Sequence, residues 1–355
     1  MAHLSSIHVV AAILIAALAG SCASRTGPDG SLAPHACPSA ADLLDRYAAN
    51  QDKLKSFVAI TDVTKRTAVE NASGQSSDMG RDTIEFRYDN SGGNLRAYYG
   101  TRSVREEGGA SVAADRGYSY LWDGKRFYQY WKTPAVEDSN VFLSRSPQQI
   151  RDAIAILYDG AGPILGILHG DLDRFDSILR HADSTSVRKE LETVGPADCY
   201  VLDAKSKHGN YTVWLDPQHD YSLAKVQVYR GPEHLRFGRP RSSYETADDV
   251  STFALSNVRF GNVEGVWIPL EIDCRLTAKY RAEGRAMTCD LHYAVAKITL
   301  NPDHVKARSF VLDIKNGTRV RLEEPTGVRH VWKDGQVVES SEKCTVEAGS
   351  TSERR

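Results

Sequence analysis

The sequence has no excess of positive charge, and this limits the partners that the protein can bind. Lysine and arginine together number 44, against 46 aspartate and glutamate residues, and the formal net charge is −2 at pH 7. A protein that grips nucleic acid through its phosphates needs clustered cationic side chains and usually carries a basic excess. The composition therefore argues against a nucleic-acid partner.

Motifs typical of catalytic and cofactor sites are also missing. The six cysteines include no Cys-x-x-Cys pair, the histidines form no His-x-x-x-His pair, and no Gly-x-Ser-x-Gly elbow occurs. Gly160 and Gly162 follow an expected helix rather than a strand and lack the third glycine of a nucleotide-binding fingerprint. We therefore expect no metal, no cofactor and no catalytic residue.

No run after residue 22 is apolar enough to cross a bilayer, but the N-terminus resembles an export signal. An apolar stretch over residues 7–19 ends in Leu18-Ala19-Gly20-Ser21-Cys22, where small residues precede a cysteine as in the lipobox of bacterial lipoproteins. Cys22 is thus the expected lipidation site. Because the n-region has no lysine or arginine and Leu18 lies one place early, ordinary cleavage near Cys22 stays open as the alternative.

The expected domain organisation follows from composition. Residues 1–22 form a lipoprotein-type signal peptide, and residues 23–37, rich in Gly, Ser, Ala and Pro, form a flexible tether. A single domain over 38–338 comes next, and residues 339–355 form a disordered tail. The protein should therefore be exported, with its domain on the periplasmic side of the envelope and its anchor in a membrane.

The domain is expected to be mainly β. A helix over 38–54 begins with a capping-box pattern at Ser39 and Asp42. About a dozen segments then alternate apolar and polar residues in hairpin order, including 82–89, 211–216, 253–260, 266–279, 287–300, 309–314 and 328–338. This order predicts a curved antiparallel half-open β-barrel with helices plugging its concave face.

The plug is expected over residues 146–169, where apolar residues recur at helical spacing. Its stripe, together with one face of the strand at 82–89, should line an apolar ligand cavity. The candidate cavity residues are Ile150, Ile154, Leu157, Ile164, Leu165, Leu168, Phe86 and Tyr88. The alternative is that these side chains complete a dry core.

Two cysteines lie on consecutive expected strands. A turn at residues 281–284 would place Cys274 opposite Cys289, where an antiparallel pair brings the Cα atoms close enough for a disulfide. We therefore expect that bond, and the pairing of Cys37, Cys199 and Cys344 stays open.

Two further clusters allow a functional and a structural interpretation. The acidic run from His169 to Asp176 favours a helix start over a calcium site, because it lacks the spacing of an EF-hand. Aromatic residues around Asp123-Gly124 in segment 117–131 predict a hairpin with a two-residue turn. Cross-strand pairing of these rings is favoured over a platform that stacks on sugars or bases.

The order of elements resembles a known family. The chain runs from signal and cysteine through helix, strands and helical plug to the turn Trp214-Leu215-Asp216-Pro217, followed by a strand that contains Lys225. This is similar to the hairpin of the LolA/LolB-like outer-membrane lipoprotein-sorting superfamily, and the Trp332–Gly335 segment also fits its large members. The chain is longer than the soluble carrier and is expected to be tethered, which resembles the receptor-side members.

The resemblance implies a half-open barrel that binds an acyl chain of a lipid or lipoprotein without chemistry. The apolar stripe of the plug agrees with such a ligand, because each buried methylene contributes about 0.8 kcal/mol. One alternative is a structural or protein-interaction module of the cell envelope with a filled core. A second is a hydrolase or carbohydrate-binding β protein. The oligomeric state does not follow from the sequence.

Overall fold

The structure, a computed structural model, describes residues 38–71, 74–107, 110–133, 135–145, 162–240, 249–280, 283–323 and 328–340, with the backbone alone at 103–107 and 110–116. The expected signal peptide and tether, most of the tail and the first part of the plug, residues 146–161, lie outside these ranges.

Within the described residues, seventeen strands form one sheet. From one edge, β7 (Ser184–Val187) and β8 (Glu192–Val194) both pair with β9 (Ala197–Ser206), and the sheet continues through β10 (Gly209–Asp216), β11 (Ser222–Arg230), β14 (Val250–Val263), β15 (Val266–Tyr280), β16 (Arg285–Leu300), β1 (Ser56–Asn71), β2 (Gly74–Asp89), β3 (Arg96–Glu107), β4 (Ala110–Trp122), β5 (Phe127–Lys132), β6 (Asn140–Ser144), β17 (Arg319–Leu322), β18 (His330–Lys333) and β19 (Gln336–Glu339).

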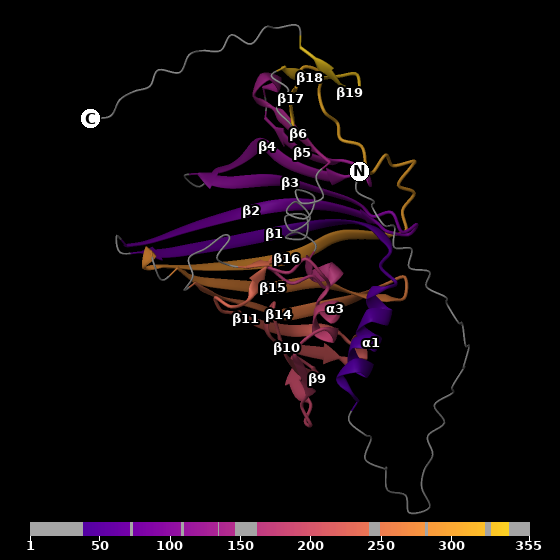
Figure 1. Ribbon diagram of the computed structural model, residues 1–355, viewed down its shortest axis with the longest axis vertical. Helices are drawn as coiled ribbons and strands as arrows, with labels where there is room; N and C mark the ends of the chain where they lie inside the picture. Colours follow the sequence, from indigo (N-terminus) through magenta and orange to yellow (C-terminus); the bar gives the residue numbers. More distant parts are fainter. Residues whose placement is uncertain are drawn as a thin grey trace, which may run out of the picture. The chain divides into compact units, whose positions relative to one another are not determined.

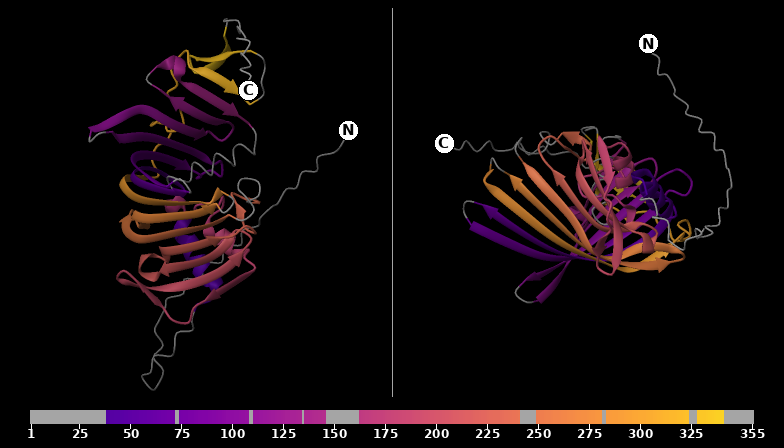
Figure 2. Two further views of the ribbon diagram at one scale, coloured as in Figure 1. Left: turned by 90° about the vertical axis from the view of Figure 1, so that its left-hand side faces the viewer. Right: turned by 90° about the horizontal axis from the view of Figure 1, so that it is seen from below.

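The sheet is antiparallel and open, as the sequence predicts. Its neighbouring strands all pair antiparallel except β6 and β17, which pair in parallel after the chain returns along residues 301–318. In the described part of the chain, β19 does not pair with the β7–β8 edge, so the barrel is not closed. Figures 1 and 2 show the sheet curving around the labelled helices. This is the expected half-open barrel.

The helices α1 (Ala40–Gln51) and α3 (Phe175–Arg180) pack on the concave face. The expected helix start is confirmed, because the Ser39 hydroxyl accepts from the Asp42 backbone N–H and the Asp42 carboxylate accepts in return. Tyr47 of α1 contacts Phe175 of α3 with ring centroids 4.2 Å apart. The helices therefore contribute apolar side chains to the main core on this face.

The alternation of side chains along the strands decides which residues face the helices. On β1, Phe57, Ala59 and Val63 are buried in the main core, whereas Asp62 is exposed. On β2 the buried residues are Ile84 and Phe86. A second, smaller cluster lies on the other face near the far edge and consists of Tyr130, Val141, Leu143, Ile314 and Val320.

The expected strand at 309–314 is wrong, although its alternation is real. Leu312 and Ile314 pack against the second cluster, while Val311 is 51% exposed. Residues 309–310 lie in a turn and residues 311–314 in no regular element, so the segment forms no ladder. The alternating pattern therefore shows that alternate side chains of this segment are buried. Such a pattern also occurs in a segment that does not pair with a strand.

The hairpin at 117–131 exists, but its turn differs from the expected one. Trp122 pairs with Phe127, which leaves a four-residue loop in which the Asp123 carboxylate accepts from the backbone N–H groups of Lys125 and Arg126 at 2.8 and 2.7 Å. The two-residue Asp-Gly turn occurs instead between β18 and β19, where Lys333 pairs with Gln336. The Asx contacts stabilise the longer loop.

His304 attaches the returning segment to the ends of β1 and β2. Its Nε2 lies 3.0 Å from Ser56 Oγ and 3.2 Å from the Tyr88 carbonyl oxygen, and its ring packs on Phe310. Nε2–H therefore donates to the carbonyl, which leaves Nδ1 bare. Nδ1 is buried and has no hydrogen-bond partner among the described residues.

Burial lowers the pKa of His304 below its ordinary value. The unfolded chain then binds more protons than the folded chain as pH falls through about 6.5, so the stability that His304 contributes at neutral pH is lost toward pH 5. Burial also lowers the pKa of His208, so the stability that His208 contributes at neutral pH is likewise lost toward pH 5.

We expect the free energy of unfolding to fall between pH 7 and pH 5, and this fall to be shallower in His304→Gln. One proton contributes at most about 1.4 kcal/mol per pH unit. Urea denaturation at several pH values measures the slope, with the exposed His181→Gln as control. Equal slopes in the His304 variant and the parent protein would contradict the assignment.

Candidate functional site

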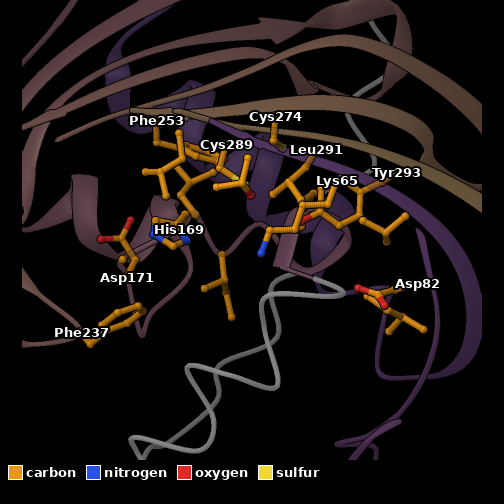
Figure 3. Close-up of a pocket in the computed structure, with 18 of the residues that line it drawn as sticks. Lys65, Asp82, His169, Asp171, Phe237, Phe253, Cys274, Cys289, Leu291 and Tyr293 are labelled. Carbon is orange, nitrogen blue, oxygen red and sulfur yellow. The ribbon is translucent and has the colours of Figure 1, made fainter. Parts of the chain in front are cut away.

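A cavity of about 370 Å³ lies on the concave face of the sheet (Figure 3). Its wall comes from β1, β2, β3, β14, β15 and β16, and its remaining side from the segment 163–171 and the turn after β12 (Leu235–Arg236). The apolar lining residues are Val63, Ile84, Tyr99, Pro163, Ile167, Leu168, Phe237, Phe253, Leu276, Met287, Leu291 and Tyr293. The remaining ones are Lys65, Thr67, Asp82, His169, Gly170, Asp171, Arg236, Cys274 and Cys289.

Strand register brings the wall residues together. Val63 on β1 lies opposite Tyr293 on β16 and Asp82 on β2, and two residues along the strand Lys65 lies opposite Leu291. Leu291 in turn lies opposite Cys274 on β15. Because alternate residues share a face, these side chains all point into the concavity. Segments far apart in the sequence thus form one mostly apolar surface.

The segment that closes the cavity on its helix side depends on tight backbone turns. Residues 162–165 are helical, and Gly166 then adopts a φ of +70°. A Cβ at this position would lie 1.8 Å from the Tyr47 hydroxyl oxygen, so only glycine fits. The Phe175 N–H donates to the Gly166 carbonyl at 2.9 Å and fixes the start of α3.

A buried ion pair holds the other end of this segment. Asp171 Oδ1 lies 2.9 Å from Arg230 Nη2 of β11, and both side chains are at least 97% buried. The Tyr211 hydroxyl donates to the same carboxylate at 3.0 Å, and Arg230 Nε–H donates to the His208 carbonyl. Burial raises the pKa of Asp171 and the nearby Arg230 guanidinium opposes that rise, so the carboxylate depends on its partners.

A short hairpin meets the segment at the cavity. The Phe237 N–H donates to the Gly170 carbonyl at 2.7 Å, between β12 and β13 (Arg239–Pro240). The His169 ring contacts the rings of Phe237 and Phe253, each with centroids 6.1 Å apart, and Arg236 Nη2 lies 3.4 Å from His169 Nε2. His169 and Phe237 are therefore held in place by packing at this side of the cavity.

The expected disulfide is not present. Cys274 and Cys289 are free thiols, and both are buried. Cys274 pairs with Leu291 and Cys289 with Leu276, so the two cysteines are two residues out of register rather than opposite. Cys199 is also a buried free thiol. Burial raises the pKa of the Cys274 thiol, and that of Cys199 to about 12.

The expected cavity residues are only partly brought together. Leu168 lines the cavity. Ile164, Leu165 and Phe86 are buried in the main core, and Tyr88 packs against it beside Phe57. Ile150, Ile154 and Leu157 lie outside the described residues. For Ile164, Leu165 and Phe86, the alternative of a filled core is the one that the structure gives.

Sequence reasoning missed most of the wall. Val63, Lys65 and Leu291 have inward positions on long strands, but the sequence does not say which stretch of a strand the helices leave uncovered. The charged side chain of Lys65 between Val63 and Thr67 on the inward face was the available signal. Such a residue interrupts an apolar face where a ligand or solvent reaches it.

The acidic run from His169 to Asp176 and the aromatic residues of segment 117–131 both make structural contacts. In the acidic run, Asp171 binds Arg230 and Asp176 binds Arg174, and the described residues include no group of three metal-ligand side chains. Tyr118 and Trp131 form an edge-to-face pair across β4 and β5, with centroids 6.2 Å apart. No helix among the described residues has the length and apolar character needed to span a membrane.

Comparison with known proteins gives structural similarity alone. No family model and no curated protein matches the chain. A domain of an outer membrane lipoprotein-sorting protein from Vibrio parahaemolyticus is 14% identical, covers 74% of this chain and 94% of its own, and has a TM-score of 0.36.

Two other solved structures are similar to a lower degree. A DUF1329 family protein from Desulfovibrio piger is 10% identical over 77% of this chain and 99% of its own, with a TM-score of 0.27. A MucA/MucB complex structure from Pseudomonas aeruginosa is 12% identical over 74% and 99%, with a TM-score of 0.22. All three TM-scores lie below 0.5, so these similarities do not identify the function of this chain.

We expect Arg230→Met to lower the free energy of unfolding by about 3–5 kcal/mol, because it leaves the Asp171 carboxylate buried without its cation. The double variant Asp171→Leu with Arg230→Met should recover much of this loss, since it removes the charge as well. Urea denaturation of both variants and of Asp171→Leu measures the coupling. Additive effects of the two changes would contradict the ion pair's role.

Proposed function

We propose that the protein binds an acyl chain of a lipid or lipoprotein in the concave cavity and catalyses no reaction. The observation that carries this proposal is the cavity of about 370 Å³ between the strands β1, β2, β3, β14, β15 and β16 and the segment 163–171. Its size lies within the range of ligand pockets, and its lining is mostly apolar. An acyl chain offers apolar area and no directional groups, which suits such a lining.

The buried polar groups at the cavity are engaged in structural contacts, which supports binding without chemistry. The Asp171 carboxylate accepts from both Arg230 and Tyr211, and His169 contacts Arg236. A general base must reach a proton on the substrate, and a carboxylate fixed between a guanidinium and a phenol is poorly suited to that task.

We expect Leu276→Glu to weaken acyl-chain binding. Leu276 is half-buried on β15 and lines the cavity, so a carboxylate there would lose its hydration when the chain enters. Titration of the full chain with a fluorescent fatty acid should show an affinity at least about tenfold weaker. Thr277→Glu, on the opposite face of the same strand and also half-buried, is the matched control.

The outcome separates the carrier from the envelope-interaction alternative. If the parent protein takes up no fatty acid and carries no lipid in native mass spectrometry, the concave face is a structural surface and the proposal fails. If both variants weaken binding equally, the site lies elsewhere.

We also propose that the protein is exported and anchored through a lipidated Cys22, with its domain on the periplasmic side of the envelope. The supporting observation is the apolar stretch that ends in small residues before Cys22. An anchor would hold the cavity close to a source of acyl chains.

Metabolic labelling with a radioactive or clickable palmitate tests the anchor. We expect the parent protein and Cys37→Ala to incorporate the label and Cys22→Ala to lose it completely. A mature protein that begins after Cys22 and carries no label would show ordinary signal cleavage instead.

A further inference from the structure

We propose that the acyl ligand carries an acidic head group, a carboxylate or a phosphate, and that the Lys65 ammonium binds it. This inference rests on the proposed function, because it names the class of ligand that the same cavity takes. The ligand class follows from the position of Lys65 and from the charges that surround it.

Lys65 occupies an inward position in an apolar part of the sheet. It lies opposite Leu291 on β16 and opposite Gly80 on β2, and it lines the cavity. Its side chain is exposed, so the ammonium keeps contact with solvent at the cavity. A lysine stem can pack along apolar surface while its charged end stays wet. The position thus suits a cation at the boundary between acyl chain and water.

The ammonium of Lys65 has no anionic partner in the described part of the chain. None of the carboxylates there lies within 4.0 Å of it. Asp82 is a diagonal neighbour across β1 and β2, at a separation that long side chains can bridge, but the two side chains point apart in Figure 3. The amine is directed into the cavity rather than toward that carboxylate.

The other charges at the cavity favour an anion on the side away from Asp82. Asp171 is neutralised by Arg230 within a buried pair, so it offers no net negative charge to a ligand. Arg236 lines the same cavity and contacts His169. The Lys65 ammonium therefore attracts an anion, and the carboxylate of Asp82 disfavours that anion on its own side of the cavity.

An acidic head group can form an ion pair with the Lys65 ammonium, and a neutral head group cannot. A charge-assisted hydrogen bond from an ammonium to a carboxylate or phosphate is roughly twice as strong as one between neutral groups. An alcohol head would leave the ammonium dependent on water.

The test compares three ligands with the same sixteen-carbon chain: palmitate, hexadecyl phosphate and hexadecanol. Each displaces an uncharged apolar dye, N-phenyl-1-naphthylamine, from the full-length protein. In Lys65→Gln we expect the affinity for palmitate or hexadecyl phosphate to fall about tenfold, with hexadecanol unchanged. In Asp82→Asn the affinity for the anions should rise about threefold. Lys279→Gln, an exposed position on the opposite face of β15, should change neither.

Each outcome decides between the claims. If Lys65→Gln weakens the binding of both anions, Lys65 recognises the negative charge that they share. If it weakens the binding of one anion alone, the head group is the carboxylate or the phosphate of that ligand. If Lys65→Gln weakens all three ligands equally or none of them, the acidic head group is refuted while acyl binding stands. If no ligand displaces the dye, and no fluorescent fatty acid binds, the proposed function itself fails.

Discussion

The pairing of β1 with β16 is the constraint on which the rest of the structure depends. It joins a strand near the start of the domain to one near its end, and it fixes Phe57 opposite Leu300 and Val63 opposite Tyr293. Because side chains alternate between faces, a shift of one residue would turn the whole apolar set of β1 outward. The core, the helices and the cavity wall all require this one register.

Among the described residues, most of the strands that form the cavity wall are longer than the helices that pack on them. β1, β2 and β16 each have sixteen residues, whereas α1 has twelve and α3 has six. The helices α1 and α3 pack in the main core, and the segment from Gly166 to Asp171 borders the cavity. A close contact at Gly166 and a buried ion pair at Asp171 hold the two ends of that segment.

Local features could be predicted from the sequence, and long-range register could not. The capping box at Ser39 depends on residues three apart, and the alternation of the strands depends on neighbours two apart. The open antiparallel barrel follows from the order of such segments. The expected disulfide is an error of register: β15 and β16 pair Tyr280 with Arg285 and therefore Cys274 with Leu291, which leaves Cys289 two residues away from the position opposite Cys274.

The candidate site was the least predictable part for the same reason. Its wall combines residues of six strands, and only Leu168 of the expected residues lines it. The stripe that suggested a cavity contributes Ile164 and Leu165 to the dry core, because helical apolar spacing shows that a face is buried but not what covers it. The sequence shows Lys65 as a cation at an inward position. The residues that lie beside it on β2 and β16 depend on strand register, which the sequence does not give.

The late arrival of β16 has a consequence for how the chain folds. While the chain emerges from its N-terminus, β1 can pair with β2 but leaves its other edge open until residues 285–300 are available. An unpaired edge of a long apolar strand is a template for association with other chains. Such non-local pairing is slow to form, because a long loop must close first. During synthesis and any transport, the open edge of β1 must therefore be kept from pairing with other protein chains until β16 is available to cover it.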